Sequence, residues 1–433
     1  MQPSRTRYVV LAGLCMAAVL AYITRNAISV AESTVRADLH LTKEQSGWLM
    51  SLFFWSYALC QIPSASVAQR LGMRRALPLL GVLWSLASAG MAAGSFVIML
   101  IMRLCMGVSQ AGLVPVGLNI IARWFPRGNQ GFAAGWFGSC MSAGGAIAAP
   151  LSAWLVVACG WRWMFALYAV PGVLWAIWFT RWLREHPAGH PRVNEAELQL
   201  IHPGFRAEDS AAPKTHPRVP WRLLFSRPAI WWICAQQFCR AAGYIFFSSW
   251  FATYLQEARG VTIIGSGLLT TLPLLGDVAG SLLGGALSDA VLRRTGNQRL
   301  ARQGLTIIAL LLCAGLILTA SFCTNAVAIV LIISTGMFCA AIGNPCASAT
   351  VMSMSGEHVA MVGGTMNMCG NLGAALFPLA VPWLLHVTGS WNAVLMGFGA
   401  LYVVAAACWW LLKTDGNVFE HKPRDDAGFT HQK

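Results

Sequence analysis

The stretch YVVLAGLCMAAVLAYITRNAISV, residues 8–30, decides the fold class of this chain. Nearly all of its side chains are apolar or small, and it is longer than the roughly 20 residues with which a helix crosses a bilayer. Arg25 lies well inside the stretch. A guanidinium at that depth is costly, and it is tolerated where it faces the interior of a helix bundle or a water-filled cavity. The stretch therefore predicts a membrane-spanning helix that turns one cation toward a polar interior.

The composition extends this prediction to the whole chain. Of its 433 residues, 57% are hydrophobic and 11% are charged, whereas a soluble protein carries about 25% charged residues. The net charge of +14 comes mainly from Lys and Arg in short segments between apolar runs, which is typical of membrane proteins. We therefore expect an all-α polytopic membrane protein without a nucleic-acid partner. The 13 cysteines show no metal-type spacing, so neither a metal site nor another cofactor is expected.

Twelve apolar spans follow one another along the chain, and a polar segment rich in proline and charge separates the first six from the last six. We expect an N-terminal six-helix half at 1–183, a cytoplasmic linker at 184–228, a C-terminal six-helix half at 229–413 and a cytoplasmic tail at 414–433. The expected spans are 8–31, 45–68, 75–95, 97–121, 130–157, 163–183, 229–255, 262–288, 303–323, 325–350, 359–386 and 391–412.

Basic residues predict the orientation in the membrane. They gather at every second connection, for example Arg74 and Arg75 after the second span and Arg293 and Arg294 after the eighth. The connections between these are nearly free of net positive charge. Since Lys and Arg remain on the cytoplasmic side, both termini and the linker are expected in the cytoplasm.

The two halves also echo each other. SASVAQRLGMRR (64–75) follows the second span and GGALSDAVLRRTG (284–296) follows the eighth. Likewise, GWRWMF (160–165) opens the sixth span and GSWNAV (389–394) leads into the twelfth. Two parallel six-helix halves with a binding site between them at the midplane are the plan of major facilitator transporters.

Four longer stretches carry a resemblance to a family within that plan. They are FFWSYALCQIP (53–63), RLCMGVSQAGLVPVGLNIIARWFP (103–126), HPRVNEAELQLI (190–201) and GTMNMCGNLGAALFP (364–378). With them the chain resembles the anion:cation symporter family of the major facilitator superfamily, which includes bacterial hexuronate, tartrate and phthalate carriers and sialin-type carriers. The resemblance implies uptake of a small organic anion, either a sugar acid such as an aldonate, hexuronate or aldarate, or a dicarboxylate. It also implies a bacterial inner membrane and a functional monomer.

Two positions depart from the family pattern. Proton-coupled members carry a carboxylate just before the arginine of the first span and another in the fourth-span motif, where this chain has Thr24 and Gln110. The sequence therefore leaves the coupling open: protons, sodium, exchange or facilitated transport.

The residues expected to bind substrate are polar groups within spans. Arg25 is always charged and its planar fork matches a carboxylate, although it could instead belong to an internal ion pair. Asn367 and Asn371 lie one turn apart on one face of their span. The further candidates, each of which could also serve packing, are Tyr57, Gln110 and Ser142.

Three more charges within the spans have two open interpretations. Arg103 takes part in proton transfer in the family, and here it could remain only as a structural donor. Arg240 and Asp277 lie in the seventh and eighth spans. They could pair with each other, or Arg240 could bind a second anionic group while Asp277 replaces the missing coupling carboxylates.

Two other functions compete with organic-anion transport. An organophosphate:phosphate antiporter is similar in pairing arginines of the first and seventh spans, but it lacks the signature at 190–201. A transporter-like sensor would need a signalling domain, and the tail 414–433 is short and polar. No HExxH, GxSxG or paired-carboxylate motif is present, so we do not expect an enzyme.

Overall fold

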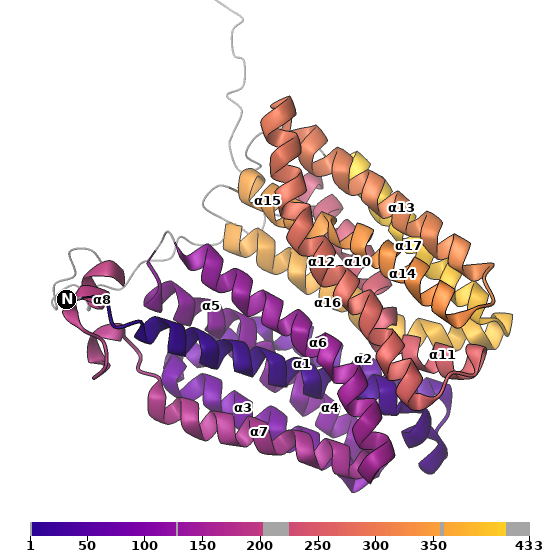
Figure 1. Cartoon of the computed structure of the whole chain (residues 1–433), viewed down its shortest axis with the longest axis horizontal. Coiled ribbons are helices and arrows are strands. Elements are labelled where there is room, and N and C mark those ends of the chain that lie inside the picture. Colours follow the sequence, from indigo (N-terminus) through magenta and orange to yellow (C-terminus); the bar gives the residue numbers. More distant parts are fainter. Residues whose placement is uncertain (1, 127–128, 202–224, 356–358, 413–433) are drawn as a thin grey trace, which may run out of the picture.

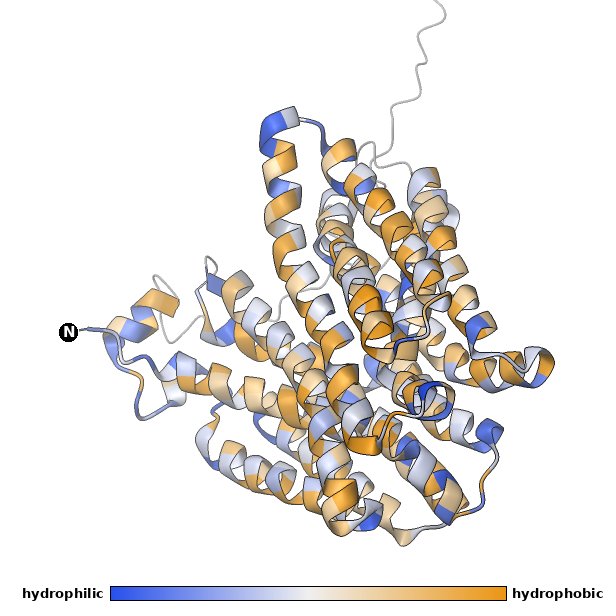
Figure 2. Ribbon diagram, turned by 45° about the vertical axis from the view of Figure 1, so that its right-hand side comes forward, coloured by the Kyte–Doolittle hydropathy of each residue, from blue (hydrophilic) through white to orange (hydrophobic). Residues whose placement is uncertain are grey.

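The computed structural model describes residues 2–126, 129–201, 225–355 and 359–412 (Figure 1). These residues form helices and connecting segments, and no strand occurs among them. Ten helical stretches in this part are long and apolar enough to cross a membrane. Figure 2 shows hydrophobic residues along the helices and strongly hydrophilic ones mainly near their ends. The chain is therefore an all-α, multi-pass membrane protein, as the sequence predicts.

Each expected span falls on one helix or on two consecutive helices. Here the helices before residue 183 are called the N-terminal half and those after residue 227 the C-terminal half. The N-terminal half contains α1 (Thr6–Asp38), α2 (Lys43–Leu71), α3 (Met73–Gly90), η1 (Met91–Ala93), α4 (Phe96–Ala111), α5 (Leu113–Trp124), α6 (Gln130–Cys159) and α7 (Trp161–Trp182). The C-terminal half contains α10 (Pro228–Ser249), α11 (Phe251–Arg259), α12 (Ile263–Thr295), η5 (Arg299–Gly304), α13 (Leu305–Ser321), α14 (Ala326–Ala341), α15 (Gly343–Ser355), α16 (Val359–Thr388) and α17 (Trp391–Leu411).

The number of spans and their orientation stay predictions. The helices α2 and α10 reach the length of a span but are not among the ten stretches that satisfy both length and composition. The expected boundaries of the two halves also remain predictions. The expected tail, 414–433, and the central part of the expected linker, 202–224, lie outside the described residues.

The two halves repeat one packing pattern. In the N-terminal half α1 packs against α6, α2 against α4 and α3 against α7. In the C-terminal half α10 packs against α16, α12 against α14 and α13 against α17. Counting each broken helix once, these are the same pairs of positions in both halves. Between the halves, α2 packs against α16 and α6 against α12, so the interface follows the same symmetry.

The sequence echoes mark equivalent turns. Gly72 follows α2 with φ of 78°, and Gly296 follows α12 with φ of 63°. Gly160 precedes α7 with φ of 84°, and Gly389 lies just before α17 with φ of 64°. Glycine adopts such positive φ values without the steric cost that a side chain would bring. The repeated glycines therefore end and begin helices at corresponding places in the two halves.

A short helix of the linker, α8 (Glu195–Ile201), holds the start of α1. The Glu197 carboxylate is fully buried and accepts hydrogen bonds from the backbone N–H groups of Thr6 (3.0 Å) and Arg7 (3.1 Å). It also forms an ion pair with Nη1 of Arg7 at 3.0 Å. A carboxylate at the first turn of a helix satisfies free N–H groups and complements the helix dipole. The signature at 190–201 thus has a structural task at the N-terminus of the chain.

Candidate functional site

A cavity of about 230 Å³ lies where helices of the two halves face each other. Its walls come from α1, α2 and α6 of the N-terminal half and from α10, α12, α15 and α16 of the C-terminal half. The lining residues are Tyr22, Arg25, Asn26, Phe54, Ser142, Gln237, Arg240, Ala241, Tyr244, Ile245, Ser248, Asp277, Asn344, Asn367, Gly370, Asn371 and Ala374.

The guanidinium of Arg25 is held by aromatic rings. Its carbon lies 4.3 Å from the ring centre of Tyr22 and 4.6 Å from those of Phe53 and Tyr57. Its Nε donates a hydrogen bond to Oε1 of Gln110 at 3.2 Å. Cation–π contacts of this kind strengthen when the cation is removed from water. Arg25, only 7% exposed, is thus fixed in direction without an acidic partner.

One nitrogen of Arg25 remains without a partner. Among the described residues no carboxylate lies within 4.0 Å of the guanidinium, and the buried Nη2 makes no hydrogen bond. A buried charged donor left unsatisfied costs free energy. Because Arg25 lines the cavity, an anion placed there could pair with the charge of its guanidinium.

The residues that replace the family carboxylates contact each other. Nε2 of Gln110 donates to Oγ1 of Thr24 at 3.1 Å and to the carbonyl oxygen of Ala21 at 3.1 Å. Thr24 in turn donates to backbone carbonyl oxygens of its own helix. An amide and a hydroxyl, which do not titrate, therefore hold the place behind Arg25 where proton-coupled members carry two acids.

Two of the residues expected to contact substrate lie against Arg25 and do not line the cavity. Gln110 is fully buried and Tyr57 is 4% exposed, and neither is among the residues that line the cavity. Both touch the guanidinium of Arg25. In this structure they orient Arg25, while Phe54 occupies the cavity wall from the same helix as Tyr57.

Arg103 joins three helices of the N-terminal half. Its Nε donates to the carbonyl oxygen of Leu49 on α2 at 2.7 Å, and its Nη1 donates to that of Arg25 on α1 at 3.1 Å. Its guanidinium carbon lies 4.9 Å from the ring centre of Phe53. These are contacts of a structural donor, and they hold the backbone of the segment that presents Arg25.

Arg240 and Asp277 lie on the same cavity without forming an ion pair. In the described part of the chain, no nitrogen of Arg240 lies within 4.0 Å of a carboxylate oxygen. Arg240 makes one hydrogen bond, from Nε to Oε1 of Gln237 at 3.3 Å. The internal pair considered from the sequence is therefore absent here, and both charges face the cavity with Arg25.

The remaining candidates line the cavity from α6 and α16. Ser142 and Asn371 are half-buried, and Asn367 is exposed. Nδ2 of Asn371 donates to the backbone oxygen of Asn367 at 2.9 Å, and Nδ2 of Asn367 donates to Oε1 of Gln61 at 3.3 Å across the two halves. The structure thus brings Arg25, Arg240, Asp277, Ser142, Asn367 and Asn371 to one cavity.

Several polar but uncharged lining residues were not among the candidates of the sequence analysis. On α10, Gln237, Tyr244 and Ser248 line the cavity with Arg240, and their offsets of −3, +4 and +8 from it place them on one helical face. The same rule places Tyr22 beside Arg25. Helical spacing from each intramembrane arginine could have found them.

Helical spacing from an arginine does not point to Asn344. It lies at the start of α15, where the span breaks after α14. Its Nδ2 donates to Oγ of Ser281 at 2.8 Å, while its buried Oδ1 accepts no hydrogen bond. Asn344 therefore adds an amide to the cavity lining, and its buried Oδ1 has no protein partner.

Comparison with known proteins places this arrangement in a family. The chain matches the Major Facilitator Superfamily over residues 14–295 and 237–430. It is 32% identical over 406 residues to the probable sulfoacetate transporter SauU of Cupriavidus necator, covering 94% of this chain and 93% of that protein. It is 30% identical over 404 residues to the probable galactarate/D-glucarate transporter GudP of Bacillus subtilis, covering 90% and 88%.

A solved structure shows the same fold. It is a bacterial homolog to the human lysosomal transporter Spinster in an inward-facing and unoccupied conformation. The TM-score is 0.76 over 94% of this chain and 97% of that one, at 19% sequence identity. The chain belongs to the major facilitator superfamily, as its repeated halves and motifs predict.

Proposed function

We propose that the protein is a secondary transporter that takes up a small organic anion, namely a sugar acid, by alternating access. The observation that carries this proposal is the guanidinium of Arg25, which lines a cavity shared by both halves and has no carboxylate within 4.0 Å among the described residues. A carboxylate of the substrate would accept from this guanidinium in a charge-assisted hydrogen bond. The names of the relatives, which are transporters of sulfoacetate and of galactarate or D-glucarate, support a carrier and not an enzyme.

The rest of the wall suits a hydroxylated anion. Around Arg25 the cavity presents the amides of Asn344, Asn367 and Asn371 and the hydroxyl of Ser142. Amide and hydroxyl side chains can exchange hydrogen bonds with the hydroxyl groups of a sugar acid. Buried polar groups of this kind reject analogues that leave them unpaired, so we expect sugar acids to be preferred over apolar carboxylates.

Arg240 suggests a second anionic group on the substrate. With Arg25 it places two guanidinium groups on one cavity, and Asp277 does not pair with it directly. A dianion such as an aldarate could engage both cations, whereas an aldonate would leave one without an anionic partner. We therefore propose that dicarboxylates are favoured over monocarboxylates of the same skeleton.

Charge balance connects this preference with coupling. The cavity is lined by two arginines and Asp277, so its net charge is +1 when Asp277 is ionised and +2 when Asp277 is protonated. A dianion neutralises the cavity only in the second case. We propose that Asp277 carries a proton with the dianion and thereby replaces the carboxylates absent at Thr24 and Gln110. Sodium at Asp277 would give the same charge balance.

The packing between the halves suggests the state of the carrier. Inter-half contacts gather where α1 ends and α2 and α12 begin, the side predicted to be extracellular. There the side chain of Ser51 donates to the backbone oxygen of Ala375. Figure 1 shows the halves together near α2 and α11 and farther apart near α5 and α15. We propose an inward-facing state of a monomer in the bacterial inner membrane.

A phosphate antiporter remains the second candidate, because two arginines on one cavity could also bind a phosphate. Counterflow in proteoliposomes separates the possibilities. Proteoliposomes that contain the purified protein and are loaded with unlabelled D-glucarate should accumulate labelled D-glucarate. Unlabelled D-gluconate added outside should inhibit this uptake less than unlabelled D-glucarate does. Exchange of inorganic phosphate with a sugar phosphate, without exchange of either acid, would contradict the proposal.

Arg240→Gln tests the dianion preference. Glutamine keeps some hydrogen-bonding capacity but loses the charge, so binding of D-glucarate should weaken by about 1.5–3 kcal/mol while binding of D-gluconate changes little. Competition in the same counterflow assay gives both affinities. An equal loss for the two acids, restored by adding Asp277→Asn, would show that Arg240 only balances the charge of Asp277.

A further inference from the structure

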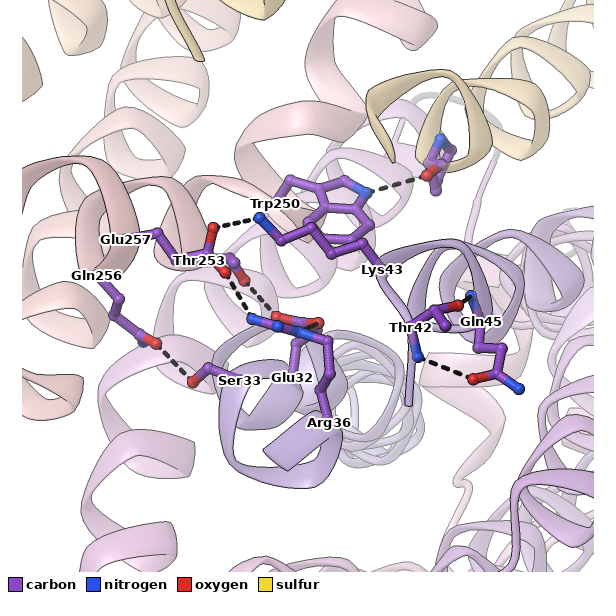
Figure 3. Close-up of polar contacts among 11 residues, drawn as sticks. Glu32, Ser33, Arg36, Thr42, Lys43, Gln45, Trp250, Thr253, Gln256 and Glu257 are labelled. Carbon is purple, nitrogen blue, oxygen red and sulfur yellow. Dashed lines mark hydrogen bonds and ion pairs between the residues drawn. The ribbon is translucent and has the colours of Figure 1, made fainter. Parts of the chain in front are cut away.

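A single carboxylate bridges two cations at the end of the molecule where α1 finishes (Figure 3). Oε1 of Glu257 lies 2.5 Å from Nη2 of Arg36, and its Oε2 lies 2.6 Å from Nζ of Lys43. Arg36 is in the last turn of α1 and Lys43 is the first residue of α2, whereas Glu257 belongs to α11. The N-terminal half thus provides a two-cation carboxylate site, and an acid of the C-terminal half fills it.

Residues of the N-terminal half fix the guanidinium of Arg36 and the backbone at Lys43. Nε of Arg36 donates to Oε1 of Glu32 at 2.8 Å, one helical turn earlier. Lys43 follows Thr42, which forms a reciprocal capping box with Gln45. The ammonium of Lys43 itself contacts groups of the C-terminal half, namely the Glu257 carboxylate and, at 5.5 Å from its ring centre, Trp391. If Glu257 moved away, Arg36 would keep its contact with Glu32, and Lys43 would remain near Arg36 at the start of α2 with its side chain released.

The contacts around Glu257 would have to separate before a solute could reach the cavity from this end. The buried Glu32 accepts at Oε2 from Oγ1 of Thr253 at 2.9 Å, and Oγ of Ser33 donates to Oε1 of Gln256 at 2.6 Å. Beneath them, a small apolar cluster joins the halves. It consists of Val30, Ala149, Ala153 and Ala252, with Ile263 packed against it.

Separation of the halves changes the charge of this mouth. Glu257 and Thr253 both lie on α11, so they would leave together with the C-terminal half. The N-terminal side would keep Arg36 and Lys43 without the carboxylate that now bridges them. The same connection carries Asp38 and Glu44, and Asp38 pairs with Arg162, so an anion would be attracted by these two cations locally and not by a net positive charge of this end. Arg25 lies on the same helix as Arg36, deeper along the path.

We propose that Arg36 and Lys43 form an outer docking site for a carboxylate of the transported anion. While this end of the molecule is closed, the carboxylate of Glu257 occupies the position that the carboxylate of the anion would take. The proposal rests on the transport function proposed above. It assigns to these residues the first contact with the anion, before the anion reaches Arg25. The contacts of Glu257 show that the site accepts a carboxylate, with one oxygen near each cation.

The distribution of lysines offers a direct test. The sequence contains lysines at 43, 214, 413, 422 and 433, and Lys43 alone lies outside the linker and the C-terminal end. A membrane-impermeant N-hydroxysuccinimide ester applied to intact cells should therefore acylate Lys43, as measured by mass spectrometry. We expect slow acylation in the wild type and several-fold faster acylation in Glu257→Gln. D-Glucarate should slow the reaction of Glu257→Gln in a concentration-dependent way.

Glu44→Gln is the matched control, since it removes the adjacent exposed acid of α2 and should leave the acylation rate as in the wild type. D-Glucose is the control solute. The proposal is overturned if Glu257→Gln reacts as slowly as the wild type, or if D-glucarate protects no better than D-glucose. Uptake of D-glucarate by wild-type cells is measured in parallel. Protection without uptake would support the docking site and contradict the transport function, whereas uptake without protection would remove the docking site alone.

Discussion

Arg25 shows at the scale of single residues how a buried charge can be kept ready for a ligand. Three aromatic rings and the Gln110 amide fix its guanidinium, and among the described residues no acid pairs with it. The sequence made this residue easy to find, because one cation interrupts an apolar run. It could not show that Gln110 and Tyr57 contact Arg25 without lining the cavity. The sequence does not tell whether a polar residue in a span faces the cavity or a neighbouring side chain.

Gln110→Glu tests whether the neutral amide keeps Arg25 available. The new carboxylate would take the place of Oε1, which accepts from Nε of Arg25 at 3.2 Å, and would compete with the substrate. We expect the affinity for D-glucarate to fall about tenfold on the alkaline side. It should recover as the pH falls, because protonation of Glu removes its charge. The measurement is the pH dependence of counterflow KM, with the wild type as control, and a variant that follows the wild type throughout would contradict this role.

At the scale of helices, the apolar pattern predicted the positions of the elements but not their interruptions. One span divides into α4 and α5 around Gly112, and another into α14 and α15 around Ile342, each shortly before a proline. Because hydropathy changes little at such breaks, the apolar pattern does not predict them. The second break matters for the site because it places Asn344 at the start of α15, on the cavity wall.

Gly107 tests the close crossing of α4 with α2. A Cβ added there would lie 2.0 Å from Oγ of Ser56 and 2.3 Å from the carbonyl oxygen of Phe53. Gly107→Ala should therefore destabilise the protein by about 1–3 kcal/mol. It should lower the melting temperature in detergent, because Phe53 and the backbone of α2 must shift. The matched control is Gly135→Ala, since a Cβ at Gly135 would meet nothing within 4 Å. Equal melting temperatures for the two variants would contradict the crossing.

At the scale of the whole molecule, the two halves share one packing pattern but differ in their charges. The N-terminal half presents Arg25 to the cavity without an acid, whereas the C-terminal half presents Arg240 together with Asp277. The sequence echoes predicted the repeat of the halves. They could not predict whether Arg240 and Asp277 pair, since that depends on the distance between side chains of α10 and α12.

Asp277→Asn tests the proposed coupling at this scale. Asparagine keeps the size of the side chain but cannot carry an exchangeable charge. The variant should still exchange D-glucarate across liposomes, while accumulation driven by a pH gradient is lost. Gradient-driven accumulation that survives in the variant would place coupling elsewhere. A sodium gradient applied at constant pH distinguishes the two ions in the wild type.

The most direct test of the account is substrate exchange by Arg25→Lys. Lysine keeps the charge but loses the planar fork of the guanidinium. We expect counterflow of D-glucarate to fall at least tenfold, about the effect of losing one charge-assisted hydrogen bond, with little change in the melting temperature. Arg162→Lys is the control, since Arg162 pairs with Asp38 at 2.7 Å and does not line the cavity. An affinity for D-glucarate in Arg25→Lys equal to that of the wild type would contradict the claim that Arg25 binds the transported anion.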